Sequence, residues 1–491
     1  MARPRSTRLL SRALLICAVW GLAGCAASLG PGYVVEQQSI QVTFLSQPEP
    51  RIHVAAEYHL KNIGNQELDS LDVRLPGRRF QPTAVSITWD GAALSPSPSP
   101  DNPRDTLLKF PTSWPIGTGR TIQLAYDINS SSSQEGSMVF TADAFHLPAE
   151  GWTPALPQPR GVFGFGGVPP KRWKLVVRVP QDFLVHASGR KEKRSARKQE
   201  TEVRFEQTAE DLSSFVVAGR YHELIQELPG HQEVHVWSRS EIHPDELRQA
   251  GDSLSKTLAA YDSLFGAGEK SKPVLWIVEC PGEGGCSSPR STLYSGILYG
   301  EGAGGFAELI SHDTVLVDPR VVHGEGEAIA GPAFAAGRLG YGQNPGYYEH
   351  QPPMSALPAF AAAVAREASS GAHVRDQIIR RALAQVPRAA PRESNNDPAV
   401  SRAKGLLLFY ALRDRVGPEN FQRAMQHMLS ARRGRGFDLT DLIAALEAES
   451  HQTLGPFVRE WFKRPGVPED FRTMYSQSNA RQKSLLPEAT P

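Results

Sequence analysis

The chain has 491 residues and a formal net charge of +1 at pH 7, with 43 glycines and 39 prolines. This length allows two or three domains, each large enough to bury its own core. The balanced charge gives no indication of nucleic acid or of an acidic substrate as a partner. The glycine and proline content favours many turns and short strands over long helices.

The N-terminus has the pattern of an export signal: several arginines precede an apolar stretch that is too short to span a bilayer comfortably. The stretch ends in Leu22-Ala23-Gly24-Cys25, which resembles the lipobox of bacterial lipoproteins. The resemblance implies cleavage before Cys25, acylation of its thiol and anchoring in a lipid bilayer. Ala26, in place of Asp, resembles the pattern for sorting to the outer membrane. We therefore expect a signal peptide at 1–24, a tether at 25–32 and a location in the cell envelope.

Two further cysteines, Cys280 and Cys286, would remain in the exported chain, because Cys17 leaves with the signal peptide. They flank a glycine-rich loop, and an exported protein meets an oxidising compartment. A disulfide between Cys280 and Cys286 is therefore the favoured prediction. A zinc-binding pair is the alternative, but no nearby histidine or second cysteine pair supports it.

From Tyr33 onward, apolar and polar residues alternate as in half-buried strands. The alternation is clearest in 39–44 and 52–60. Further strands are expected at 68–75, 84–89, 106–110, 121–126, 138–141, 173–179, 202–206 and 214–219. This pattern predicts an antiparallel β-sandwich-like domain over residues 33–228.

A basic run, Arg190–Lys198, falls inside this predicted domain. We interpret it as a solvated turn. Contact with anionic polymers of the envelope is a minor alternative.

The period of the apolar pattern changes at Glu233. A predicted helix at 244–265 is followed by buried strands at 274–278 and 314–317, which favours a separate α/β lobe over 232–370. Helices are then expected at 357–368, 374–384, 399–415, 418–431, 439–450 and 454–462. These give a helical lobe over 371–466, and residues 467–491 are expected to form a polar tail.

The helical part carries a family resemblance in three motifs: Lys404-Gly405 before an apolar helix, Gly417-Pro418-Glu419-Asn420-Phe421, and Phe457-Val458-Arg459-Glu460-Trp461. Together they resemble the membrane alanyl aminopeptidases, which are gluzincin zinc metallopeptidases. Trp152-Thr153-Pro154 and Ala187-Ser188-Gly189 are similar to the β domain of that family. The resemblance implies a thermolysin-like α/β lobe after the β domain, a C-terminal α-helical lobe, and a cleft between these two lobes.

The zinc motif of the family is missing. The zinc helix belongs at 327–342, EAIAGPAFAAGRLGYG, but the required H-E-x-x-H pattern is absent there. The resemblance places Gly331, Pro332 and Ala335 where the two histidines and the glutamate should stand. It places Ala359 where the third ligand, a glutamate, should stand. None of these side chains binds zinc, and Pro332 would also interrupt the helix.

A rearranged metal site is the alternative interpretation, and its candidate ligands lie before and after the small-residue stretch. These candidates are His323, Glu325, Glu327, His350 and Glu367. The catalytic tyrosine of the family would fall near Ser401 and Arg402, where the sequence has no tyrosine.

We therefore expect an envelope-anchored lipoprotein with an aminopeptidase-like scaffold, no catalytic residues and no metal cofactor. It would bind a peptide, an envelope protein or a glycan through the former cleft. The alternative is an active exported zinc aminopeptidase with an atypical site. A serine hydrolase ranks lowest, because no Gly-x-Ser-x-Gly elbow is present.

Overall fold

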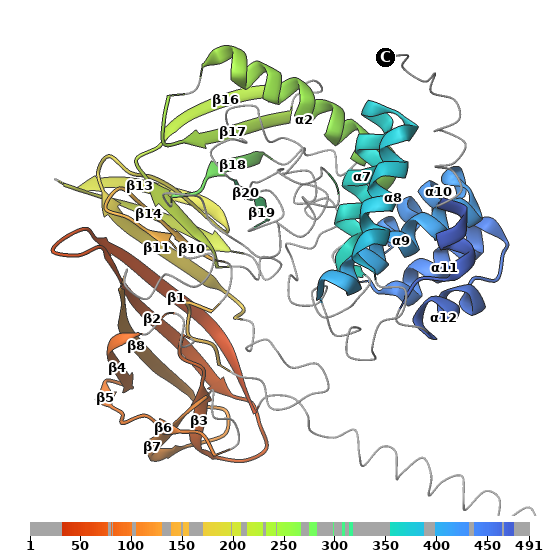
Figure 1. Ribbon diagram of the computed structural model, residues 1–491. Coiled ribbons are helices and arrows are strands. Elements are labelled where there is room, and N and C mark those ends of the chain that lie inside the picture. The colour runs from red at the N-terminus through yellow and green to blue at the C-terminus, as the bar shows by residue number, and fades with distance from the viewer. Residues whose placement is uncertain are drawn as a thin grey trace, which may run out of the picture.

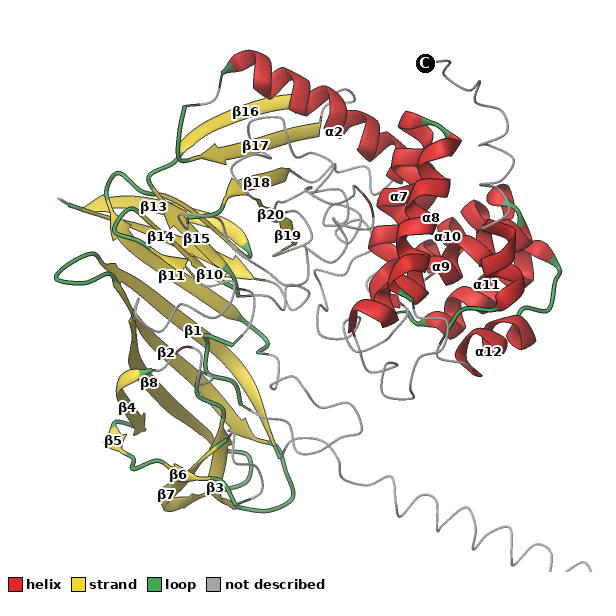
Figure 2. Cartoon of the chain, in the orientation of Figure 1, coloured by secondary structure: helices red, strands yellow, loops and turns green. Residues whose placement is uncertain are grey.

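The computed structural model describes most of residues 32–475 (Figure 1). The gaps within this range are 77–79, 81, 101–104, 130–138, 149–150, 157–169, 198, 208–213, 229–231, 242, 267–273, 282–297, 299–306, 310–313, 318–353, 387–397, 432–436 and 464–465. Within the described part, strands dominate the N-terminal half and helices the C-terminal half (Figure 2).

The N-terminal part contains one large sheet and two small ones. The large sheet has the order β13 (Arg190–Arg197), β14 (Glu200–Gln207), β11 (Trp173–Pro180), β1 (Tyr33–Leu45), β2 (Arg51–Asn62), β8 (Gly119–Asn129), β4 (Thr83–Trp89) and β5 (Ala92–Ala93). One small sheet has the order β3 (Leu68–Val73), β7 (Thr106–Trp114) and β6 (Ser97–Pro98). The other has the order β12 (Leu184–Ala187), β15 (Val216–Gly219), β10 (Ala144–Leu147) and β9 (Val139–Phe140). Strict alternation of buried and half-buried residues along β2 places one face of the large sheet on the core.

Two expectations for this part were wrong. The large sheet is mixed rather than antiparallel, because β1 pairs with β11 in parallel, with Val42 opposite Val177. Arg190–Arg197 forms edge strand β13 rather than a turn, because its backbone pairs with β14. Charged residues are common on edge strands, where they oppose pairing with other chains.

Two buried tyrosines hold the segment around Trp152 against the core of the β domain. The Tyr58 hydroxyl donates to the Pro154 carbonyl at 2.6 Å, and the Tyr126 hydroxyl donates to the Trp152 carbonyl at 2.5 Å. The indole of Trp152 donates in turn to the Ser214 carbonyl at 2.9 Å. Every polar group in this set is therefore paired inside the core.

A second, five-stranded sheet follows, with the order β16 (His222–Leu228), β17 (Gln232–Ser238), β18 (Leu275–Glu279), β20 (Thr314–Val317) and β19 (Ala307–Leu309). Strands β17, β18 and β20 are parallel, and helix α2 (Pro244–Phe265) connects β17 with β18. The predicted domain boundary at 228 needs correction, because β16 pairs with β17. The lobe therefore begins directly after β15.

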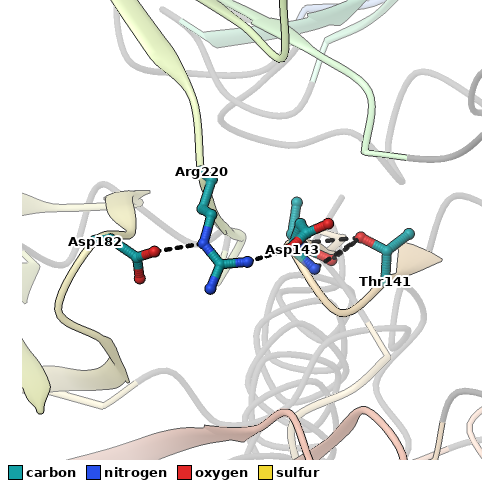
Figure 3. A network of polar contacts seen from close by, with 5 residues as sticks. Thr141, Asp143, Asp182 and Arg220 are labelled. Atoms are coloured by element: carbon teal, nitrogen blue, oxygen red, sulfur yellow. Dashed lines mark hydrogen bonds and ion pairs between the residues drawn. The ribbon is translucent and has the colours of Figure 1, made fainter.

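The chain passes from the β domain to the α/β lobe through Gly219, Arg220 and Tyr221. A Cβ on Gly219 would lie 2.5 Å from the Ala144 Cβ, so this position admits only glycine without a rearrangement. The Arg220 guanidinium lies between Asp143 and Asp182 and pairs with both (Figure 3). These contacts fix the connection on the β-domain side.

Aromatic side chains fill the joint between these two parts. The ring of His186, on β12, stacks on Trp276, on β18, with centroids 4.0 Å apart. The Nε2 atom of His186 lies 2.9 Å from the hydroxyl of Thr314, on β20. The Tyr221 ring stacks on Trp237 at 5.5 Å. The joint is therefore a packed interface between the four-stranded and five-stranded sheets.

The C-terminal part consists of α7 (Leu357–Ser370), α8 (Ala372–Gln385), α9 (Pro398–Val416), α10 (Pro418–Ala431), α11 (Leu439–Ser450) and α12 (Gly455–Lys463), with a short 3₁₀ turn, η4 (Met354–Ala356), before α7. Local sequence sets the ends of these helices. Gly417, with φ of 85°, ends α9 before Pro418 begins α10. Asp438 and Asp441 form a capping box at the start of α11.

The helical lobe shares one apolar core with α2 and with β17, β18 and β20. This core continues past residue 466, because Val467, Phe471 and Tyr475 are buried in it. The predicted start of the tail at 467 was therefore wrong for residues up to Tyr475. None of the described helices is long and apolar enough to cross a membrane.

Candidate functional site

Helix α7 is the first described α-helix after the stretch where the zinc motif is missing. Alanines from 359 to 363 favour a helix, and Pro358 stands in its first turn, where a missing N–H costs nothing. All side chains from Leu357 to Ala363 are buried. The helix packs against α2, α8 and α9. It therefore forms the centre of the shared core.

Ala359 stands where the family resemblance puts the third zinc ligand. It is 0% exposed and belongs to the apolar core. A methyl group has no lone pair to coordinate a metal, and a carboxylate in this apolar setting would need a cation beside it. The residues of α7 at this position do not fit a zinc site.

Glu367 is the first carboxylate on α7 and the only candidate ligand that lies within the described ranges. One of its oxygens lies 2.6 Å from Nη1 of Arg413, on α9. The two side chains are only 17% and 18% exposed. Arg413 is therefore the partner of Glu367 in this structure.

A second polar set lies beside this pair. Arg375, on α8, pairs with Asp414 and donates to the Tyr475 hydroxyl at 2.6 Å. The Tyr475 hydroxyl donates to the other oxygen of Asp414 at 2.5 Å. The guanidinium of Arg375 also lies over the Tyr410 ring at 5.9 Å. These contacts tie the C-terminal segment to α8 and α9.

The hydroxyl of Tyr410 is buried and has no hydrogen-bond partner among the described residues. Burial raises the pKa of this phenol well above its ordinary value, and the nearby Glu367 carboxylate raises it further. The phenol therefore stays protonated at physiological pH. It lies about two turns beyond Ser401 and Arg402 on α9, so it does not stand where the family resemblance places the catalytic tyrosine.

The carboxyl ends of the parallel strands meet around Glu279, which the sequence pattern did not single out. Glu279 is 5% exposed, and its carboxylate accepts hydrogen bonds from the Ser238 hydroxyl at 2.7 Å and the Arg239 amide at 2.8 Å. Its carbonyl accepts from the Tyr221 hydroxyl at 3.1 Å. This edge is where open α/β sheets commonly bind ligands. Here the carboxylate is occupied by donors from β17 and holds the two strand ends together.

Lys404 belongs to the Lys-Gly motif that carried the resemblance. It lies on α9, is 9% exposed, and its ammonium is 5.9 Å from the centre of the Phe462 ring on α12. Burial lowers the pKa of this lysine. Its contact with α12 explains the motif as packing between helices.

Most of the predicted site lies outside the described residues. This applies to Cys25, to Gly331, Pro332 and Ala335, to Cys286, and to His323, Glu325, Glu327 and His350. Cys280 is described and is fully buried at the end of β18. Among the residues that the structure places, no group of three or more histidine, cysteine or acidic side chains could hold a metal ion.

No family model matches the sequence, and no curated protein matches it. Solved structures do match the fold. A mutant M1 zinc metallopeptidase from Deinococcus radiodurans has a TM-score of 0.60 at 15% sequence identity, over 90% of this chain and 97% of that chain. The fold is that of an M1 aminopeptidase.

Two further M1-like matches agree. The M1 zinc metallopeptidase from Deinococcus radiodurans without the mutation has a TM-score of 0.57 at 15% identity, over 90% of this chain and 96% of that one. Legionella pneumophila aminopeptidase A, in complex with aspartic acid, has a TM-score of 0.56 at 15% identity and matches over 90% of this chain and 50% of its own length. The expected aminopeptidase-like scaffold is thus confirmed at the level of fold.

Proposed function

We propose that this chain is a lipid-anchored protein of the bacterial envelope that uses an M1-like scaffold for binding rather than for zinc-dependent hydrolysis. Its partner would be a peptide or an envelope protein held in the region that an M1 enzyme uses for substrate. The observation that carries the proposal is the chemistry of α7. Ala359, where the family resemblance puts a zinc ligand, is buried, and Glu367 is paired with Arg413.

A catalytic zinc needs three protein ligands and one open position for water. Gly331, Pro332, Ala335 and Ala359 offer no imidazole, thiolate or carboxylate. Without a metal, no group at these positions lowers the pKa of an attacking water or accepts its proton. A scaffold of this kind retains surfaces for binding but not the zinc-dependent reaction.

The alternative is an exported metallopeptidase that uses Glu367 with His323, Glu325, Glu327 or His350. In that case the carboxylate of Glu367, one oxygen of which is paired with Arg413, would have to reach the metal, and any shift away from Arg413 would break this pair. A partly buried charge pair of this geometry costs free energy to break, because one buried charge is left without a partner. The ion pair therefore favours the binding protein over the rearranged enzyme.

Metal content and turnover test the proposal together. The purified full chain and two variants, Glu367→Gln and the control Glu460→Gln, are supplied with zinc, dialysed, and analysed for zinc and for hydrolysis of aminoacyl-anilides. Glu460 lies on α12 and pairs with Lys463 at the surface. We expect substoichiometric zinc and no chelator-sensitive hydrolysis in all three proteins. About one zinc per chain, lost in Glu367→Gln and kept in Glu460→Gln, would establish the enzyme instead.

Membrane anchoring has its own test. We expect a Cys25→Ser variant to move from the membrane fraction to the soluble fraction and to lose the mass of its acyl chains. Cys17→Ser is the matched control, because Cys17 would leave with the signal peptide. A Cys25→Ser protein that stays in membranes, with its mature N-terminus elsewhere, would refute lipidation at Cys25.

We also propose a disulfide between Cys280 and Cys286. The motivation is that these are the two cysteines left to an exported chain. The loop is short, so the disulfide would add at most about 3 kcal/mol to stability on the chain-entropy estimate. Mass spectrometry without reduction should show no free thiol at either position, and two free thiols would disprove the pairing.

A further inference from the structure

The face of the large sheet that points away from the core is polar across seven strands. Because residues paired directly across strands point to the same side, the register defines its rows. Figure 1 shows the sheet as one continuous twisted layer from β13 to β4. One end of this face, on β11, β14 and β13, is cationic, and the rest is neutral or mixed in charge.

The cationic end is built around Glu202, which has a side chain only 4% exposed. Its two oxygens pair with Arg178 at 3.0 Å and with Arg204 at 2.7 Å. The hydrogen bond from Arg204 is the main cause that holds the pKa of Glu202 below its ordinary value, and Arg178 adds to it. One buried carboxylate thus holds the guanidinium groups of two arginines whose side chains remain 35% and 52% exposed.

Two lysines add to this cluster. Lys193 lies directly across from Arg204, and Lys174 lies on β11 one row away, opposite Glu206, whose carboxylate pairs with Arg190. Neither lysine forms an ion pair with any residue that the structure describes. Like charges directly opposite each other in a sheet cost stability, because their side chains lie about 5 Å apart. The cluster therefore has more positive charge than its own carboxylates neutralise, and an anion beside Arg204 and Lys193 would relieve the repulsion.

A hollow of about 350 Å³ adjoins the cluster on the same face. Strand β1 links the two features, because Ser39 is paired with Lys174 and Gln41 with Val176. Ala55 and Ala125, opposite each other on β2 and β8, keep the centre of the hollow open. Most of the other lining residues have hydroxyl, amide or carboxylate groups, including Ser39, Gln41, Glu57, Thr88 and Gln123.

We propose that this face binds an anionic oligosaccharide, with sugar units in the hollow and their carboxylate or phosphate groups on Arg178, Arg204, Lys174 and Lys193. Hydroxyl and amide side chains both donate and accept, which suits sugar hydroxyls. Guanidinium groups held in place suit carboxylate and phosphate geometry. The inference uses the β domain alone and is independent of what the helical lobe does.

Other partners fit this face less well. An extended peptide binds a sheet by pairing with a free edge, or by filling apolar pockets. The hollow lies over β1, β2 and β8, whose backbones are already paired on both sides. A bilayer would need exposed apolar or aromatic side chains to insert, and the hollow is lined by polar and alanine side chains apart from Leu124. The cationic cluster beside a mostly polar hollow therefore favours an anionic glycan over a peptide or a bilayer.

Calorimetric titration of the detergent-solubilised full chain tests the proposal. The probes are a hexamer of galacturonate, a neutral hexamer of glucose, inorganic phosphate and phosphatidylglycerol vesicles. We expect the galacturonate hexamer to bind more tightly than the other three probes. We also expect its affinity to fall as salt rises, because screening acts over about 10 Å at 0.1 M ionic strength.

Three variants locate the binding. Lys174→Gln/Lys193→Gln should weaken galacturonate binding roughly tenfold, since two exposed ion pairs are lost. The matched control, Lys256→Gln/Lys463→Gln, removes two exposed lysines from α2 and α12 and should change nothing. Ala125→Phe fills the hollow and should weaken binding of the galacturonate hexamer. Circular dichroism should show that this variant remains folded.

Each remaining outcome overturns the proposal in a distinct way. Equal binding of neutral and acidic hexamers would remove the role of charge. Phosphate binding as tight as the hexamer would reduce the cluster to an anion site without a sugar site. Vesicle binding without hexamer binding would make this face a membrane contact. Equal loss in the two double-lysine variants would show that binding follows net charge alone.

Discussion

The β domain and the helical lobe both bury tyrosines, but the hydroxyl groups differ in whether they form hydrogen bonds. Tyr58 and Tyr126 donate to carbonyl oxygens of the segment around Trp152. Tyr410 is equally buried, yet its hydroxyl has no partner among the described residues. An unpaired buried hydroxyl costs free energy, so its presence calls for an explanation.

The packing around Tyr410 supplies part of that explanation. Its ring meets Phe360 edge to face at 5.2 Å and lies under Arg375 at 5.9 Å. Dispersion and cation–π contacts therefore offset an unsatisfied hydroxyl. In the β domain, the complete pairing of the tyrosine hydroxyls is consistent with a stabilising role for the segment around Trp152. In the helical lobe, polar groups lie together beside α7, and the Tyr410 hydroxyl has no partner among the described residues.

The largest effect is expected at the joint between the β domain and the α/β lobe. Gly219→Ala would place a Cβ within 3.0 Å of Ala144, Tyr221 and the Asp143 carbonyl, so the free energy of unfolding should fall by about 3 kcal/mol. Gly119→Ala is the control, since its Cβ would lie 3.6 Å from the Leu60 carbonyl. Denaturant titration measures both variants. Equal stability of the two would show that the joint is not tightly packed.

Tyr126→Phe tests the paired tyrosines directly. Removing its hydroxyl leaves the buried Trp152 carbonyl without a donor, so we expect a loss of about 2 kcal/mol in the free energy of unfolding. Chemical unfolding followed by tryptophan fluorescence provides the measurement. A loss no larger than that of Tyr410→Phe would erase the contrast between the two regions.

Glu202→Gln extends the comparison to charge and should cost about 1 kcal/mol at neutral pH, because both arginine partners are partly solvated. The folded-state pKa of Glu202 is lowered, first by the Arg204 hydrogen bond. Its stabilisation is therefore complete above the unfolded pKa of about 4.3 and disappears as pH falls through the lower folded pKa.

Unfolding curves of wild type and Glu202→Gln at a series of pH values from neutral to acidic should therefore converge at the acid end. Glu206→Gln, on the same strand, removes the same charge from a pair with a separation of 3.5 Å. It should have a smaller effect. A difference between wild type and Glu202→Gln that persists at the lowest pH would exclude this linkage.

Tyr410→Phe should have the smallest effect. The change removes a hydroxyl without a hydrogen bond and keeps the ring contacts, so the free energy of unfolding should stay within about 0.5 kcal/mol or rise. The same unfolding assay applies. A loss as large as that of Tyr126→Phe would mean that the hydroxyl has a partner, such as a bound water.

Local patterns in the sequence predicted most strands and helices. Alternation identified β2, and the Gly417-Pro418 junction identified the break between α9 and α10. The parallel pairing of β1 with β11 could not be read from alternation, because partner choice depends on contacts far apart in sequence. The basic strand β13 was missed because lysine and arginine have low β propensity.

Of the four positions where the resemblance puts zinc-site residues, only Ala359 lies in the described part of the chain. Ala359 could be placed on α7 by family resemblance, and its burial agrees with an apolar role. The pairing of Glu367 with Arg413 depends on two helices that meet in three dimensions, and no spacing in the sequence indicates it. The same holds for Glu279, whose donors Ser238 and Arg239 come from a neighbouring strand.

The place of β1 inside the large sheet has a consequence for how the chain folds. β1 is the first strand in sequence, but it lies between β2 and β11, so it is completed only when β11 arrives. During synthesis, β1 and β2 can form a hairpin early, with the outer edge of β1 still open. The segment between them and β11 must emerge before that edge closes. Such long-range pairing is slow, and an exposed edge invites pairing with other chains. The open edge of β1 is therefore closed only once Pro180, at the end of β11, has been synthesised.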